Sequence, residues 1–154
     1  MIDTRWGRSG KGPRPSPWGD AIRLLVTGAD TKGCCALVEM TTRRGAEPPC
    51  HLHHREDQVV YVLEGNLTFC LEDERLPRSA GTSVLLPAGR EHGFAVDSDE
   101  AKLLVIVAPA GLEDFYAAVT EAIPAGQPAV EWLVALAARH GIEITGPPFR
   151  TSRS

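Results

Sequence analysis

Short apolar runs alternate with turn residues from Ala21 to Pro109. Pro, Gly, Asn and Asp separate the runs, and no run shows a sustained helical period of about 3.6 residues. The runs are AIRLLV, CCALVEM, VVYVLEG, LTFCLE, TSVLLP, HGFAV and AKLLVIVA. Many short strands at regular spacing are typical of an all-β sandwich or barrel.

The pattern changes to a helical period after Pro109. In AGLEDFYAAVTEA the apolar residues recur at i, i+3, i+4 and i+7, which places them on one face of a helix. A second helix is predicted over AVEWLVALAARHG, ending at Gly141, and its apolar face requires cover from the barrel exterior or from a second subunit. The first face comprises Leu112, Phe115, Tyr116 and Val119, and the second comprises Val130, Leu133, Val134 and Ala137. The tail GPPFRTSRS is predicted to be a frayed end.

Residues 1–19 are rich in Gly, Pro and Ser and carry four basic residues against one acid. Such a segment cannot bury enough apolar surface to order itself, so we expect a basic N-terminal arm. Trp18 is expected to dock on the main body. The expected organisation is an arm over residues 1–19, a β-barrel over residues 20–109, and a helical extension and tail over residues 110–154.

Composition limits the classes of partner. The 154 residues, 43% hydrophobic and 23% charged, suit one soluble domain with a substantial core. A net charge of -4 argues against a nucleic-acid partner or an anionic membrane surface. The four cysteines show no CxxC spacing, so we expect free buried thiols in a reducing compartment. Neither a signal-peptide pattern nor an apolar stretch of about 18 residues is present, and the expected location is the cytoplasm.

The segment HLHHREDQ carries the strongest chemical signal. Side chains alternate faces along a strand, so His51 and His53 point the same way and can chelate one divalent metal ion. Gln58 begins the next apolar run and can lie near the same point, and His92 follows the turn in PAGREH. Three neutral nitrogens and one oxygen suit Zn, Ni, Mn, Fe or Co, and the sequence does not choose among them.

The glycine and proline spacing around these residues resembles the cupin superfamily. Its first motif, G-x5-HxH-x(3,4)-E-x6-G, is matched by Gly45, His51, His53 and Gly65, with Gln58 in place of the acid. Its second motif, G-x5-PxG-x2-H-x3-N, is matched by Gly81, Pro87, Gly89 and His92, with Val96 in place of the final Asn. The segments TGADTKG, PPCHLHHRED, YVLEGNLTF and VAPAGLEDFY are similar to the quercetin-dioxygenase-like branch of single-domain cupins.

The resemblance implies an all-β fold: a single cupin (jelly-roll) β-barrel with C-terminal helices, often a dimer, holding one divalent transition metal ion. Its ligands would be His51, His53 and His92, with Gln58 at the position of the motif's glutamate. An amide binds metal through its oxygen, but it neither neutralises the charge of the ion nor accepts a proton. The ion therefore keeps its full charge, which favours polarisation of a carbonyl over oxygen chemistry. In flavonol-cleaving cupins the motif glutamate is understood as the base, a part that Gln58 cannot play.

These features favour a metal-dependent enzyme that uses Lewis-acid chemistry of the cyclase, isomerase or lyase type. The resemblance supports this choice, because cupins with three histidines and a glutamine include uronate-linearising isomerases and hydroxynitrile lyases, and small monocupins include aromatic polyketide cyclases. One alternative is an O2-dependent quercetinase-like dioxygenase, and another is a non-catalytic ligand-binding cupin. The expected partners are a small carbonyl-bearing, aromatic or polyketide-like substrate and a second copy of the chain in a homodimer.

Apolar residues near the expected ligands predict an apolar substrate pocket. Phe94 shares the face of His92, Val60 and Val62 share the face of Gln58, and Phe69 is a further candidate. Such a pocket suits an aromatic or lipophilic substrate, and the alternative is that these residues are plain barrel core.

The sequence names no catalytic base. Glu39 is expected to face solvent, His54 to lie on the surface, and His140 to be a cation near the C-terminal end of a helix.

Overall fold

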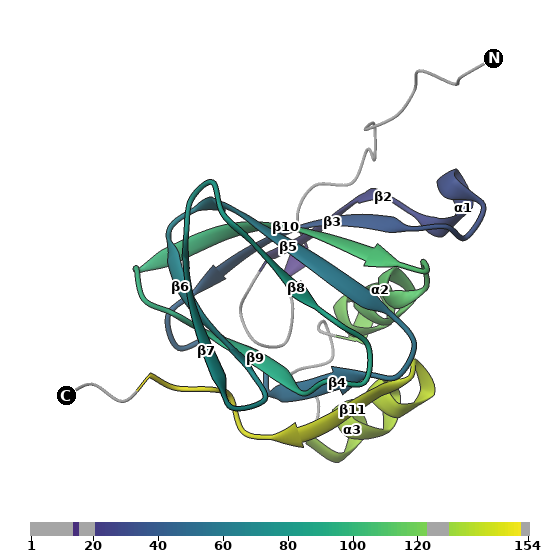
Figure 1. Ribbon diagram of the computed structural model, residues 1–154. Helices are drawn as coiled ribbons and strands as arrows, with labels where there is room; N and C mark the ends of the chain where they lie inside the picture. Colours follow the sequence, from purple (N-terminus) through teal and green to yellow (C-terminus); the bar gives the residue numbers. More distant parts are fainter. Residues whose placement is uncertain (1–13, 16–20, 123–129, 152–154) are drawn as a thin grey trace.

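Two antiparallel sheets face each other and form a barrel in the computed structural model, which describes residues 14–15, 21–122 and 130–151 (Figure 1). The first sheet contains, in order, β1 (Arg14–Pro15), β2 (Ala21–Val26), β3 (Ala36–Arg43), β10 (Glu100–Ala108), β5 (Asp57–Glu64) and β8 (Ser83–Leu86). The second contains β11 (Ile142–Gly146), β4 (Cys50–His53), β9 (His92–Val96), β6 (Asn66–Leu71) and β7 (Glu74–Ser79). The all-β prediction is confirmed. Trp18 lies outside the described residues, as does the N-terminal arm except for Arg14–Pro15.

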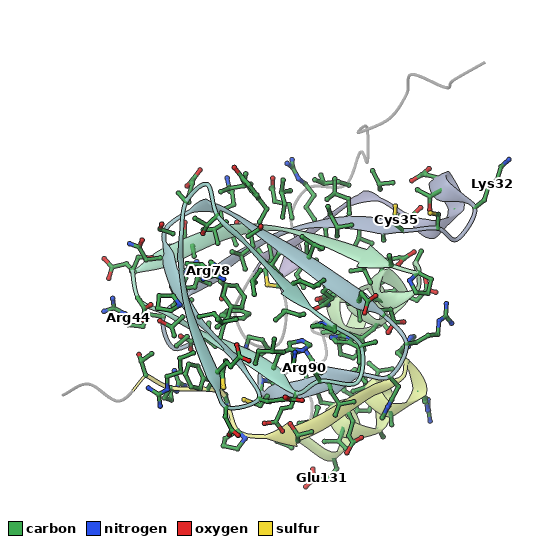
Figure 2. All side chains as sticks on the ribbon, viewed as in Figure 1. Lys32, Cys35, Arg44, Arg78, Arg90 and Glu131 are labelled. Atoms are coloured by element: carbon green, nitrogen blue, oxygen red, sulfur yellow. The ribbon has the colours of Figure 1, made fainter. Side chains whose placement is uncertain are left out.

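Strand alternation builds the barrel interior. Along β5 the side chains of Gln58, Val60 and Val62 are buried, whereas those of Val59 and Tyr61 are exposed. The strands of both sheets send apolar side chains into the space between them (Figure 2). Each fully buried Val, Leu or Phe contributes roughly 1.5–3 kcal/mol, so this shared interior holds the two sheets together.

Both predicted helices are present, as α2 (Leu112–Ala122) and α3 (Val130–Arg139). The apolar face of α2 packs on the core, with Leu112 and Val119 fully buried. The face of α3 is only partly covered, because Ala137 is buried while Val130 is 71% exposed. A short helix, α1 (Gly28–Thr31), was not predicted because four residues are too few to show a period.

The C-terminal segment is more ordered than the sequence analysis expects. β11 pairs with β4, and the amide of Cys50 donates to the carbonyl of Pro147 at 3.3 Å. Arg150 forms an ion pair of 2.8 Å with the buried Glu47. The prediction of a frayed end is therefore wrong for Gly146 to Arg150, because an acid far away in the sequence holds this segment on the barrel.

The edge strand β7 was also not predicted. Its sequence ERLPRS is mostly polar and exposed and contains Pro77, so it shows no buried run. Proline in a sheet is confined to edges and bulges, and β7 lies at the edge of its sheet.

The four cysteines are more exposed than the sequence predicts. All four cysteines lie in the described part of the chain and are free, but Cys34 is exposed and the others are half-buried, so the expectation of buried thiols is wrong. Their positions in a turn and on outward-facing strand positions explain this exposure.

Among the described helices none is long and apolar enough to cross a membrane.

Candidate metal centre

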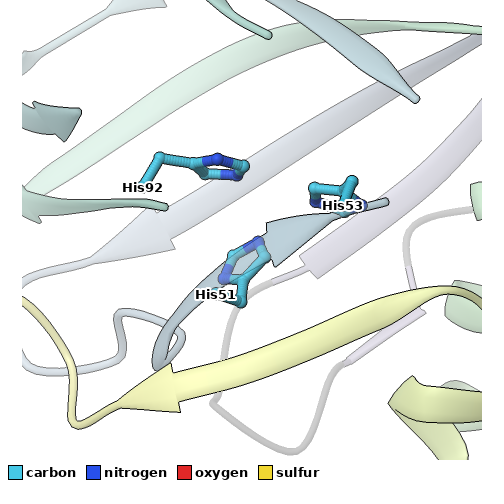
Figure 3. Close-up of side chains that lie close together, drawn as sticks. All are labelled: His51, His53 and His92. Carbon is cyan, nitrogen blue, oxygen red and sulfur yellow. The ribbon is translucent and has the colours of Figure 1, made fainter. Parts of the chain in front are cut away.

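Three histidines lie together on two neighbouring strands of the five-stranded sheet. β4 carries His51 and His53, and β9 begins at His92, which lies directly opposite His51 in the antiparallel register (Figure 3). The ring centroids are 4.6 Å apart for His51 and His92 and 5.0 Å apart for His51 and His53. One nitrogen from each ring lies within 4.8 Å of the others. This spacing allows all three imidazoles to bind a single ion.

Backbone carbonyls orient two of the rings. Nδ1 of His51 lies 2.7 Å from the carbonyl oxygen of Pro49, and Nδ1 of His92 lies 3.1 Å from that of Arg90. A carbonyl only accepts, so each Nδ1 carries the hydrogen and each Nε2 presents a lone pair. Metal-binding histidines usually show this arrangement, because the outer hydrogen bond holds the ring in its binding tautomer.

Three of the remaining ring nitrogens lack hydrogen-bond partners in the described part of the chain. Nε2 of His92 and both ring nitrogens of His53 are buried without a hydrogen-bond partner among the described residues. Leaving buried polar atoms unpaired costs about 1–3 kcal/mol each. A divalent metal ion fits this donor set, since it would give partners to buried nitrogens that otherwise have none.

Burial keeps these imidazoles neutral. It lowers the pKa of His53 to about 2, and the neighbouring His51 and His92 act in the same direction. Burial also lowers the pKa of His92 to about 3 and lowers that of His51 against the opposing effect of its hydrogen bond to Pro49. Neutral imidazole is the form that binds metal, so the cluster is ready to bind an ion near neutral pH.

A buried carboxyl group that the sequence analysis did not single out lies beside His53. Glu56 is 3% exposed, and its Oε2 lies 3.9 Å from Nδ1 of His53. Burial raises the pKa of Glu56, while its own backbone amide and the charge of Arg55 act in the opposite direction. The alternation of β5 (Asp57–Glu64) does not reach it, because Glu56 lies in the loop before that strand, where His54 of the same parity is exposed.

Gln58 lies on the inner face of β5, between Val107 of β10 and Leu86 of β8, and is 5% exposed. It therefore faces the barrel interior, as the resemblance implies for this motif position. Its part as a fourth ligand stays a prediction.

A cavity of about 50 Å³ reaches His51 and His53. The rest of its lining is almost wholly apolar and comes from segments far apart in the sequence. It comprises Ile22, Met40, Pro48, Pro49, Leu112, Phe115, Tyr116, Ala137, Ile142 and Ile144. No pattern in the sequence predicts this lining, and its helical members were expected only as apolar helix faces, because the tertiary fold alone brings β2, α2 and β11 to the histidines.

The residues predicted to line a substrate pocket lie elsewhere in the interior. Val60, Val62, Phe69 and Phe94 belong to the buried core, with the two phenylalanine rings 5.7 Å apart. They are not part of the lining of the 50 Å³ cavity in the described chain. Their contact with substrate stays a prediction.

The other polar residues considered from the sequence lie outside the cluster. His54 is exposed and pairs with Glu143 at 3.1 Å, as its surface assignment requires. Glu39 pairs with Arg23 between neighbouring strands at a half-buried, outward-facing position. His140 follows α3 and packs its ring 5.8 Å from that of Phe115.

Comparison with known proteins agrees with this architecture. Residues 38–108 match the family model of the cupin domain. The chain is 24% identical over 108 residues to quercetin 2,3-dioxygenase of Bacillus subtilis (strain 168), covering 70% of this chain and 32% of that protein. It is 32% identical over 100 residues to polyketide synthase CurC of Streptomyces cyaneus, covering 63% of this chain and 64% of the relative. The chain thus spans less than two thirds of the length of either relative.

Solved structures show the same fold. KdgF from Halomonas sp. superposes with a TM-score of 0.62 at 20% identity, covering 70% of this chain and 95% of that one. Pac13, described as a nucleoside dehydratase, superposes with a TM-score of 0.59 at 17% identity, covering 73% of this chain and 87% of that one. At this level of identity the likeness establishes the barrel and not the reaction.

Proposed function

Since the chain belongs to the cupin superfamily and brings together three histidines, two of them buried, we propose that it is a metal-dependent enzyme of the cyclase, isomerase or lyase type. The observation that carries this proposal is the convergence of three imidazole rings, with unpartnered nitrogens, beside an apolar cavity. Structural histidines in a core normally find hydrogen-bond partners, so this arrangement favours a ligand set.

The proposed ligands are His51, His53 and His92, with the side-chain oxygen of Gln58 as a fourth. A divalent Zn, Ni, Mn, Fe or Co ion bound there would supply Lewis acidity toward a carbonyl oxygen. The neutral donor set leaves the charge of the ion uncompensated by any ligand, which strengthens that polarisation. This is why we favour redox-neutral chemistry.

The proposed substrate is small, carbonyl-bearing, and aromatic or polyketide-like. The apolar cavity lining supports this choice, as does the similarity to polyketide synthase CurC. A volume of about 50 Å³ suits only a few water molecules, so an aromatic substrate requires the side chains of α2 to move. Phe115 and Tyr116 would then pack on the substrate and exclude water from the reacting carbonyl.

The alternative function is an O2-dependent dioxygenase. The 24% identity to quercetin 2,3-dioxygenase favours it. Gln58 argues against it, because an amide cannot take the substrate proton that the motif glutamate would accept.

Metal analysis followed by anaerobic and aerobic assays tests the proposal. Protein purified without a histidine tag is assayed for bound metal and then incubated with polyketone and flavonol substrates while oxygen uptake is recorded. Metal-dependent conversion without oxygen uptake supports the proposal, and metal-dependent oxygen uptake supports the dioxygenase. If the wild-type protein binds no metal, the function that remains is that of a non-catalytic ligand-binding cupin.

We also propose that the protein is a homodimer. An apolar row crosses the outer face of the six-stranded sheet, with Ile106 paired to Val59 and Val59 paired to Leu85. These side chains are 43%, 37% and 55% exposed, respectively. Sedimentation of the wild type and of Val59→Lys tests this, with a shift to monomer expected for the variant. The cytoplasmic location stays a prediction.

A further inference from the structure

The third histidine of the cluster lacks the backbone partner that the other two have. His51 and His92 each direct Nδ1 at the carbonyl of the residue two positions earlier. Nδ1 of His53 has no hydrogen-bond partner among the described residues. No backbone group of the described residues therefore selects the ring tautomer of His53.

Glu56 is in the position to do so. Its Oε2 lies 3.9 Å from Nδ1 of His53, and both side chains are almost completely buried, at 4% and 3% exposed. This oxygen is also without a partner in the described part of the chain. Two buried polar atoms that face each other unpaired need to approach by only about 1 Å to form a hydrogen bond, which would remove the cost of both.

The surroundings of Glu56 hold it in place. The turn at Ala110 and Gly111 lies over the carboxyl group, since a side-chain carbon added at Gly111 would lie 3.8 Å from Oε1 of Glu56. Arg55 donates from Nη2 to the carbonyl of Ala110 at 3.2 Å and so fixes this turn to the loop that carries Glu56.

We propose that Glu56 is a positioning residue for the metal centre: its carboxylate accepts a hydrogen bond from Nδ1–H of His53 and holds the ring so that Nε2 presents its lone pair to the ion. This inference rests on the proposed metal site. In this arrangement the carboxylate of Glu56 contacts the ligand His53 and not the ion. Gln58 stands at the position where the motif has an acidic ligand. Glu56 therefore provides the acidic partner of the cluster without touching the ion.

Cobalt titration of three proteins tests the proposal. Wild type, Glu56→Ala and Glu56→Gln are freed of metal and titrated with Co²⁺, and the visible absorption spectrum reports both affinity and ligand geometry. We expect Glu56→Ala to bind Co²⁺ about 10–100-fold more weakly, with an altered spectrum. Glu56→Gln should recover most of the affinity and the wild-type spectrum, because its amide oxygen still accepts the hydrogen bond.

Glu47→Gln is the matched control. Glu47 is also buried, but it accepts from the amides of Gly45 and Val96 and pairs with Arg150, away from the histidines. The control should lose stability and keep the cobalt affinity of wild type. Equal affinities for wild type and Glu56→Ala would overturn this inference alone, whereas a wild type that binds no Co²⁺ would overturn the metal site as well.

A second measurement needs no variant. Long-range ¹H–¹⁵N NMR of the metal-free wild type identifies which ring nitrogen of His53 carries the hydrogen. The proposal requires the hydrogen on Nδ1, and a hydrogen on Nε2 would overturn it.

Discussion

His51 on β4 lies directly opposite His92 on β9, with their ring centroids 4.6 Å apart. A one-residue slip between these strands would turn one of the two rings to the outer face of the sheet, so the strand register itself assembles the cluster. His53 then joins because it is two residues from His51 on the same strand face.

Replacement of His51 by Ala should remove the metal. The wild type should gain about 2.7 kcal/mol from an ion present at a hundredfold excess over its Kd, which corresponds to roughly 5–10 °C in Tm. The variant should lose this gain, as measured by elemental analysis and calorimetry with and without added Zn²⁺. His54→Ala is the control, because His54 is exposed and outside the cluster, and it should bind metal as wild type does. Unchanged metal content in His51→Ala would place the site elsewhere.

The substitution Gln58→Glu should keep the metal and change the chemistry. A carboxylate neutralises one charge of the ion and can accept a proton, so we expect tighter metal binding and a gain in oxygen uptake with flavonol substrates. An oxygen electrode and a metal titration make the measurement. If the variant matches wild type in both, Gln58 lies outside the ligand set.

The metal-free protein should lose stability on acidification. Unfolded histidine binds a proton below its ordinary pKa of 6.5, whereas the lowered pKa values of His53 and His92 are about 2 and about 3. The unfolded chain therefore binds more protons between pH 6.5 and pH 3, and the free energy of unfolding falls by about 1.4 kcal/mol per pH unit for each histidine. The raised pKa of Glu56 has the opposite sign and acts just above pH 4.5.

Urea unfolding at pH 7 and pH 5 measures this effect. Each of the two histidines should contribute a loss of about 2 kcal/mol at pH 5. His53→Asn should show a smaller loss, since the amide does not titrate. Equal stability of the metal-free wild type at both pH values would contradict the burial of neutral imidazoles.

Two motif glycines should differ in their tolerance of Ala. Gly65 and Gly45 have φ values of +87° and +91°, so either substitution strains the backbone by about 1–2 kcal/mol. A side-chain carbon at Gly65 would also lie 2.5 Å from the carbonyl oxygen of Glu100, whereas nothing lies within 4 Å at Gly45. Gly65→Ala should therefore lose about 2 kcal/mol more than Gly45→Ala in urea unfolding. An equal loss in the free energy of unfolding of the two variants would show that the backbone of β10 moves away from the added carbon without cost.

Much of this protein was determined by local patterns in its sequence. The alternation of β5, the period of α2 and the glycine frame around His51, His53 and His92 each act over short distances, so they predicted the barrel, its helices and the three histidines. Such signals are local because side chains return to the same face of a strand or helix every few residues.

The tertiary structure alone decided the rest. It brought Glu56 to His53, Arg150 to Glu47, and the side chains of β2, α2 and β11 to the wall of the cavity. These contacts depend on how distant segments pack across the two sheets, and a polar residue shows no periodic signal of the partner that it will meet. The environment of the histidines, and with it the chemistry that they support, is therefore a property of the packed barrel.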